Sequence, residues 1–141
     1  MTENSFDFLK DHSTHYLEMA FRSDHRGSIE HPDGYGKRTG ECGDTVEMYL
    51  SVRKGCIQSV AYQTHGCINT NACTNTVVRL AEGRQIADAW EISADDISEY
   101  LQTLPAENYH CAELAVGALY RALLDYNDKQ QRPWKKLYSS R

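Results

Sequence analysis

The fold is decided by three consecutive segments, DTVEMYLSV (residues 44–52), RKG (53–55) and CIQSVAYQT (56–64). In the first segment apolar residues alternate with polar ones, which predicts a half-buried β-strand. The second segment ends in a glycine and is typical of a turn, and the third is again rich in strand-forming residues. We therefore expect the first and third segments to pair as an antiparallel hairpin.

The chain on either side of this hairpin indicates helices. Apolar periodicity predicts a helix before it over residues 6–22, and helices after it over residues 69–82, 86–90, 93–103 and 108–128. Gly83 is typical of a helix end, Ser93 of a helix start and Pro105 of a break between helices. The last helix is expected to have an apolar side made by Leu114, Leu119, Leu123, Leu124 and Tyr126. Residues 23–40 are rich in glycine and polar residues, and we interpret them as a long functional loop.

Together these elements indicate an α+β fold, in which a small antiparallel sheet of about three strands has helices packed on one face. A chain of 141 residues is long enough to bury a core without disulfides or structural metals. We expect a single domain over residues 1–130 and a mobile C-terminal tail over residues 131–141.

Composition and charge exclude several classes of protein. The net charge of −5 and the lack of a basic stripe argue against nucleic acid as a partner. No apolar run approaches the roughly 18–20 residues of a membrane span, so no membrane association is expected, and the polar N-terminus has no signal-like segment. Five cysteines are an odd number and are expected to be thiols in a reducing cytoplasm.

Three short clusters carry the residue types that bind thiophilic metals: Cys42-Gly43-Asp44, His65-Gly66-Cys67 and His110-Cys111. They are far apart in sequence, so they can meet only if the whole domain folds around them. In an extended segment Cys42 and Asp44 point to the same side. A carboxylate beside thiolates is unusual for structural zinc, but it suits a site that binds iron and later releases it. A buried cysteine next to a turn aspartate is the alternative interpretation of the first cluster.

The other two clusters lie where helices are expected to begin. Cys67 follows the second strand, and His110-Cys111 opens the last long helix. A helix N-terminus stabilises a thiolate and lowers the pKa of the thiol, which favours metal binding and nucleophilic attack. Both residues of the His-Cys pair can reach one metal only from the edge of the helix, because neighbouring helical residues point about 100° apart.

The remaining cysteines and histidines carry weaker signals. Cys56 is expected to be a half-buried strand residue. Whether Cys73 or His65 joins the site is left open by their spacing from Cys67. No metal-ligand spacing is found at His12, His15, His25 and His31, which we interpret as solvated polar residues.

At these residues the sequence resembles the IscU/NifU-type iron–sulfur cluster assembly scaffolds, the NifU N-terminal domain family. The family pattern has Cys-Gly-Asp at the start of a strand, Gly-Cys before a helix and His-Cys at the start of the last long helix. Here Cys42-Gly43-Asp44, Gly66-Cys67 and His110-Cys111 follow in that order at similar intervals. The likeness extends over residues 16–129 and includes Gly83-Arg84 and residues 92–97.

The resemblance implies a SufE/NifU-like α+β scaffold, which is not a turnover enzyme. Such a protein takes sulfur from a cysteine desulfurase and iron from a donor, uses an electron donor, and builds a transient [2Fe–2S] cluster for apo-proteins. Carried over by position, Cys42, Cys67 and Cys111 bind the cluster, Cys111 accepts sulfur, Asp44 makes the cluster labile and His110 is an auxiliary ligand. Zinc can occupy the same site in this family, and a cluster shared in a homodimer is left open.

Three segments depart from the family pattern. Residues 69–73 read Asn-Thr-Asn-Ala-Cys in place of a small-residue stretch, and Cys73 is extra. Residues 21–24 read Phe-Arg-Ser-Asp where the family has Asn-Pro-Arg-Asn, and residues 104–108 read Leu-Pro-Ala-Glu-Asn where it has Leu-Pro-Pro-Val-Lys. The segment at residues 104–108 is read by an Hsp70-type chaperone in other members, so that interaction is not predicted here. A zinc-dependent sulfurtransferase with a metal-activated acceptor thiol is the alternative function, and a non-catalytic interaction domain with structural cysteines is a third hypothesis.

Overall fold

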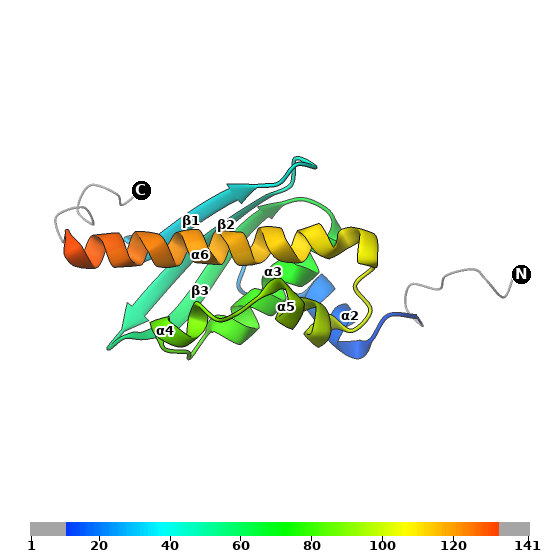
Figure 1. Cartoon of the computed structure of the whole chain (residues 1–141), viewed down its shortest axis with the longest axis horizontal. Helices are drawn as coiled ribbons and strands as arrows, with labels where there is room; N and C mark the ends of the chain where they lie inside the picture. The colour runs from blue at the N-terminus through cyan, green and yellow to red at the C-terminus, as the bar shows by residue number, and fades with distance from the viewer. Residues whose placement is uncertain (1–10, 133–141) are drawn as a thin grey trace, which may run out of the picture.

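The computed structural model describes residues 11–132 (Figure 1). Its strands are β1 (Gly34–Thr39), β2 (Thr45–Arg53) and β3 (Cys56–His65), which form an antiparallel sheet in the order β1-β2-β3. Its helices are α2 (Thr14–Phe21), α3 (Ile68–Ala81), α4 (Ile86–Ala89), α5 (Ala94–Leu101), the 3₁₀ turn η1 (Ala106–Asn108) and α6 (Tyr109–Gln131). None of these described helices is both long and apolar enough to span a membrane.

The predicted hairpin is present. Strand β2 buries Val46, Met48 and Leu50, as its alternating pattern indicates. The two residues between the paired Arg53 and Cys56 are Lys54 and Gly55, whose φ angles are 55° and 77°. A two-residue connection with both φ angles positive suits the right-handed twist of the paired strands.

Residues 34–39 are a strand rather than part of an irregular loop, so the expectation for the 23–40 segment is wrong there. Strand β1 pairs with β2 from Gly34↔Leu50 to Thr39↔Thr45. A Cβ atom on Gly36 would lie 2.4 Å from the carbonyl oxygen of Ala118, and one on Gly34 would lie 2.4 Å from that of Ala122. The two glycines therefore allow the strand backbone to lie directly against α6, although they carry no apolar pattern.

The helices cover one face of the sheet, as predicted. In Figure 1 α6 crosses the whole length of the sheet, and α3 and α5 lie beside it; α6 packs on β1 and β2, and α3 packs on β3. Helix α5 begins with a capping box, in which Ser93 and Asp96 each accept a hydrogen bond from the backbone N–H of the other. Helix α3 gives way to Gly83 at a φ of 88°, the left-handed conformation expected beyond a helix end.

Two helix predictions need correction. The first helix does not run unbroken to residue 22, because Ser13 caps α2 and its hydroxyl accepts a hydrogen bond from the Tyr16 N–H. Residues 6–10 of that prediction lie outside the described residues. Leu124 is 59 % exposed and does not belong to the buried side of α6, whereas Leu119 and Leu123 are buried.

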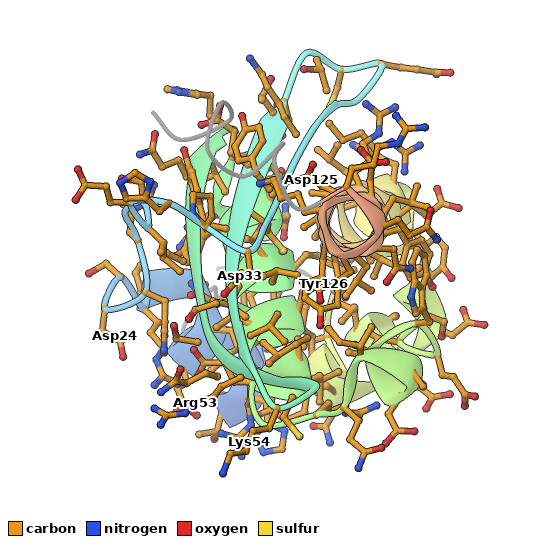
Figure 2. All side chains as sticks on the ribbon, turned by 90° about the vertical axis from the view of Figure 1, so that its left-hand side faces the viewer. Asp24, Asp33, Arg53, Lys54, Asp125 and Tyr126 are labelled. Carbon is orange, nitrogen blue, oxygen red and sulfur yellow. The ribbon has the colours of Figure 1, made fainter. Side chains whose placement is uncertain are left out.

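Polar contacts fasten the second half of α6 to the start of β1. Asp125 Oδ2 accepts a hydrogen bond of 2.9 Å from the Tyr35 N–H, and it lies 3.0 Å from the Nζ atom of the buried Lys129. Lys129 also donates to the Pro32 carbonyl oxygen at 3.3 Å. Figure 2, seen from this end, places Asp125 and Tyr126 on α6 beside the strands. The tail expected from residue 131 falls mostly on residues 133–141, which lie outside the described residues.

Candidate metal centre

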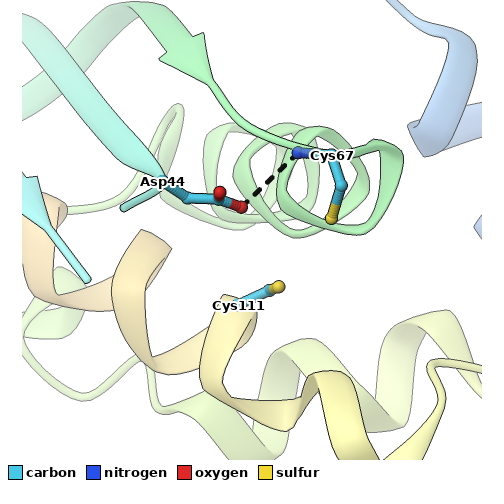
Figure 3. Close-up of side chains that lie close together, drawn as sticks. All are labelled: Asp44, Cys67 and Cys111. Atoms are coloured by element: carbon cyan, nitrogen blue, oxygen red, sulfur yellow. Dashed lines mark hydrogen bonds between the residues drawn. The ribbon is translucent and has the colours of Figure 1, made fainter. Parts of the chain in front are cut away.

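The structure brings the three predicted clusters to one end of the molecule. Asp44 follows the β1–β2 loop, Cys67 stands between β3 and α3, and Cys111 is in the first turn of α6. One carboxylate oxygen of Asp44 and the sulfur atoms of Cys67 and Cys111 all lie within 4.8 Å of one another (Figure 3). Three side chains from three separate elements therefore converge on a volume the size of a metal site.

The Asp44 carboxylate is held by its surroundings. Its Oδ2 atom accepts hydrogen bonds from the Thr70 hydroxyl at 2.6 Å and from the Cys67 N–H at 3.4 Å, the latter drawn in Figure 3. Gly66 lies directly behind the carboxylate, because a Cβ atom there would be 2.6 Å from Oδ2. The His-Gly-Cys spacing thus has a steric reason, since any side chain at position 66 would displace the Asp44 carboxylate.

The first cluster is not extended, so the prediction that Cys42 and Asp44 share a side in an extended segment is wrong. Gly43 has a φ of 92°, and the Gly40 N–H donates to the Asp44 carbonyl oxygen across a tight loop. Cys42 is exposed in this loop and does not belong to the close set of Asp44, Cys67 and Cys111.

Cys67 is the N-cap residue of α3 and is exposed. Burial raises the pKa of its thiol, but hydrogen bonds from the backbone and hydroxyl of Thr70 and from the backbone of Asn69 stabilise the thiolate. These hydrogen bonds outweigh burial, so the pKa is lowered. The expectation that the helix start favours the Cys67 thiolate is confirmed.

Cys111 differs from this expectation. It is fully buried, and burial raises the pKa of its thiol more than the hydrogen bonds from Thr70 and Asn108 lower it. The neighbouring Cys67 thiol raises this pKa further. The expectation that the start of α6 lowers the pKa of the Cys111 thiol is therefore wrong, because the effect of burial outweighs that of the hydrogen bonds.

His110 lies next to the three converging ligands. Its Nδ1 atom is 3.1 Å from the Glu107 carbonyl oxygen, and its Nε2 atom is 3.7 Å from the Cys111 sulfur. A carbonyl oxygen can only accept, so in the neutral ring Nδ1 carries the hydrogen and Nε2 keeps its lone pair. The Nε2 lone pair of this exposed histidine therefore lies beside the Cys111 sulfur, although His110 does not belong to the set of three close ligand atoms.

Cys42 and His110 line the same cleft, a hollow of about 420 Å³ next to the three ligands. Arg38 crosses this cleft and donates to the Glu113 carbonyl oxygen at 3.1 Å. The five predicted site residues therefore fall into two groups. Asp44, Cys67 and Cys111 are already together, whereas Cys42 and His110 stand along the adjoining cleft.

The other candidates lie outside the close set. Cys73 is fully buried in the core, and burial raises the pKa of its thiol. His65 is exposed at the end of β3, and Cys56 is half-buried, as predicted. His12 is buried rather than solvated, since its ring stacks on Tyr16 at 3.7 Å. In the described part of the chain, neither Cys73 nor His65 belongs to the set of mutually close ligand atoms.

Thr70 is a site residue that the sequence interpretation missed. Its buried hydroxyl lies 2.6 Å from Asp44 Oδ2, 3.5 Å from the Cys111 sulfur and 3.8 Å from the Cys67 sulfur. The only signal in the sequence is its position three residues after the N-cap Cys67, where a side chain turns back toward the start of the helix.

The donor set fits a thiophilic metal. One carboxylate oxygen and two sulfurs, with an imidazole nitrogen beside them, are ligand types that zinc and iron share. Cys67 is exposed, so one side of the set is open to an incoming group. The arrangement can hold a metal ion or accept sulfur at a thiolate, and its oxygen ligand matches a sulfide-bearing cluster poorly.

Comparisons with known proteins identify the family of the chain. The family described as NifU-like N terminal domain matches residues 12–133. The chain is 37 % identical over 101 residues to iron–sulfur cluster assembly scaffold protein IscU 1 of Archaeoglobus fulgidus, covering 71 % of this chain and 66 % of that protein. It is 32 % identical over 91 residues to the scaffold protein IscU of Escherichia coli, covering 64 % of this chain and 70 % of that protein.

Solved structures support the fold. The N-terminal part of a nitrogen-fixing NifU-like protein from Brucella abortus superposes with a TM-score of 0.70 at 18 % identity, covering 83 % of this chain and 94 % of that one. A protein from Fervidobacterium islandicum that is assigned to the SUF system of iron–sulfur cluster assembly gives a TM-score of 0.66 at 19 % identity, covering 79 % of this chain and 95 % of that one. The protein described here belongs to the NifU-like N-terminal domain family.

Proposed function

We propose that the protein is a scaffold for iron–sulfur cluster assembly. The observation that carries the proposal is the convergence of Asp44, Cys67 and Cys111 at one end of a NifU-like fold. Sequence relatives that are named as assembly scaffolds support it, and the matched region covers about two thirds of the Archaeoglobus protein. In this proposal iron and sulfide are cargo that the site collects and passes on.

Sulfur enters the proposed sequence as a persulfide on a cysteine desulfurase. A thiolate of the scaffold attacks the outer sulfur, the sulfur–sulfur bond breaks, and the desulfurase leaves as a thiolate. An electron donor then supplies two electrons to reduce the new persulfide to sulfide and thiolate. Cluster formation needs sulfide and iron together, so an iron donor is the other proposed partner.

Cys111 remains our proposed sulfur acceptor, with a requirement that the structure adds. The Cys111 thiol is buried and its pKa is raised, so the start of α6 must move before a persulfide reaches it. Cys67 is the competing acceptor, because it is exposed and the pKa of its thiol is lowered. Mass mapping of the persulfide after a single desulfurase turnover, on Cys67→Ser and Cys111→Ser variants, distinguishes these two acceptors.

The proposed cargo is a [2Fe–2S] cluster, held by Cys42, Cys67 and Cys111 with Asp44, and His110 as an auxiliary ligand. Two observations support this set: Cys67 and Cys111 lie close to Asp44, and Cys42 and His110 line one cleft. Zinc is proposed as a second occupant, because the same ligand types suit it. The proposed setting is a reducing cytoplasm, where five free cysteines stay as thiols.

Anaerobic reconstitution tests the proposal. The protein is incubated with ferrous iron, cysteine, a reductant and a cysteine desulfurase, and iron and sulfide are counted per chain while visible spectra are recorded. A scaffold develops sulfide-to-iron charge-transfer bands with equal amounts of iron and sulfide, and it passes them to an apo-ferredoxin. A chain that takes up only zinc and develops no such bands contradicts the scaffold proposal.

Asp44→Ala is expected to make the reconstituted cluster longer-lived. The carboxylate is the ligand that matches iron–sulfide chemistry least well, so its removal leaves ligands that hold the cluster more firmly. The decay of the visible bands in the presence of a chelator measures the lifetime, with Asp88→Ala, on the exposed surface of α4, as control. A variant that loses its cluster faster than the wild type contradicts the role given to Asp44.

A further inference from the structure

We propose that Thr70 is a positioning residue, whose hydroxyl holds the Asp44 carboxylate in place before a metal arrives. Thr70 is fully buried, and its hydroxyl donates to Asp44 Oδ2 at 2.6 Å. The inference rests on the proposed function, since it concerns the ligands of the same site. It adds a residue outside the proposed ligand set to those that determine how the site takes up metal.

The Thr70 hydroxyl has a different kind of hydrogen-bond acceptor from the hydroxyls of two other buried threonines on the same helix. Thr74 donates to the Thr70 carbonyl oxygen and Thr76 to the Ala72 carbonyl oxygen, each four residues earlier and each at 2.8 Å. Such bonds back to the helix are the ordinary way for a buried threonine to satisfy its hydroxyl. Thr70 stands in the first turn, and it makes its short bond to a carboxylate 26 residues away instead.

The distances decide which neighbour receives the single hydroxyl proton. The Asp44 oxygen is 2.6 Å away, whereas the sulfurs of Cys111 and Cys67 are 3.5 Å and 3.8 Å away. Hydrogen bonds to an ionised acceptor are shorter and roughly twice as strong as neutral ones, so the carboxylate is the main acceptor. The weaker Cys67 N–H contact at 3.4 Å supports the same oxygen.

Fixing one carboxylate oxygen does not prevent the group from binding a metal. A carboxylate has about four lone-pair sites, so a bond to Oδ2 leaves other lone pairs available. Without the Thr70 bond, Asp44 at the end of a loop must be ordered when the metal binds, and this cost weakens binding. We therefore expect the hydroxyl to raise metal affinity by preorganising the oxygen ligand.

Zinc affinity of the metal-free protein is the direct test, measured by competition with a chromophoric chelator. Thr70→Val keeps the shape of the side chain but removes the donor, and zinc binding should weaken about 10- to 100-fold, as is typical when a partner of a ligand is lost. Thr70→Ser restores a hydroxyl and should bind zinc within a few-fold of the wild type. Thr76→Val is the matched control, because it removes a buried hydroxyl from the same helix away from the ligands.

A double-mutant cycle shows whether Thr70 acts through Asp44. In an Asp44→Ala background the carboxylate is gone, so adding Thr70→Val should change zinc affinity by less than about threefold. If the full loss persists in that background, Thr70 acts on the thiols and not on Asp44, and the proposal is overturned. Wild-type zinc affinity in Thr70→Val, or an equal loss in Thr76→Val, overturns it too.

The zinc-binding results test the role of Thr70 independently of the scaffold function. Zinc binding is measured without iron, sulfide or a desulfurase, so it reports on the ligands whether or not a cluster forms. Failure to develop charge-transfer bands in reconstitution counts against the scaffold, and an unchanged zinc affinity in Thr70→Val counts against the positioning role. Circular dichroism of each variant confirms that a changed affinity is not a loss of fold.

Discussion

At the scale of single residues, the environment of each cysteine matters more than its place in a motif. Cys67 and Cys111 both lie near helix starts, but the first is exposed and the second is fully buried. Hydrogen bonds therefore lower the pKa of the Cys67 thiol against the effect of burial, whereas burial raises the pKa of the Cys111 thiol. Two cysteines at helix starts thus have pKa values shifted in opposite directions.

The first prediction concerns the order in which the thiols react. In the metal-free protein, iodoacetamide should modify Cys67 and the exposed Cys42 first, Cys111 more slowly and Cys73 last. The thiolate is the reactive form, so as pH rises Cys67 should begin to react at a lower pH than Cys111 or Cys73. Peptide mass spectrometry after timed quenching gives each rate, and faster modification of Cys111 than of Cys67 would contradict the prediction.

At the scale of elements, the contact between β1 and α6 decides how the β1–β2 loop is placed beside the start of α6. Strand β1 lies against α6 through Gly34 and Gly36, where side chains would overlap the helix backbone. The loop that follows β1 carries Asp44 to the site. The position of one metal ligand therefore depends on a backbone contact formed by residues that have no chemical role.

We predict that Gly36→Ala lowers the free energy of unfolding by about 1–3 kcal/mol or more. The new Cβ would lie 2.4 Å from two backbone atoms of α6, and helix backbone cannot move aside as a flexible side chain can. Urea denaturation followed by circular dichroism measures the loss. Gly40→Ala is the control, because its Cβ would lie 3.6 Å from Leu114, an ordinary contact, and the two variants should not be equally destabilised.

At the scale of the whole molecule, the proposed metal ligands connect parts of the chain that are distant in sequence. Asp44 follows the β1–β2 loop, Cys67 caps α3 and Cys111 lies on α6, so a bound ion links the sheet to two helices. A ligand that binds only the folded protein stabilises it in proportion to the logarithm of its concentration. Metal binding is therefore expected to stabilise the fold and not just the loops.

Zinc should raise the thermal midpoint of the wild-type protein by an amount corresponding to about 2.7 kcal/mol at a free zinc concentration of 100 times Kd. Differential scanning calorimetry with and without zinc measures the shift. Cys67→Ser should lose most of it, because a hydroxyl replaces a thiolate ligand. Cys56→Ser, a half-buried cysteine outside the close set, should keep it, and equal shifts in both variants would contradict this site.

The sequence by itself determined the hairpin of β2 and β3, most of the helices and the residues proposed for the metal centre. Alternating apolar residues such as Val46, Met48 and Leu50 act locally, as do helix signals such as Ser93. Such signals depend on the chain's own periodicity and capping, so they can be recognised without knowing what packs against them.

Only the tertiary structure decided the place of β1, the burial of Cys111 and the role of Thr70. Gly34 and Gly36 form a strand because a helix more than 80 residues later packs against their backbone, so no apolar alternation indicates it. Thr70 becomes a site residue because folding brings Asp44 to within 2.6 Å of its hydroxyl. Contacts between residues that are distant in sequence depend on three-dimensional packing, so they cannot be predicted from local periodicity.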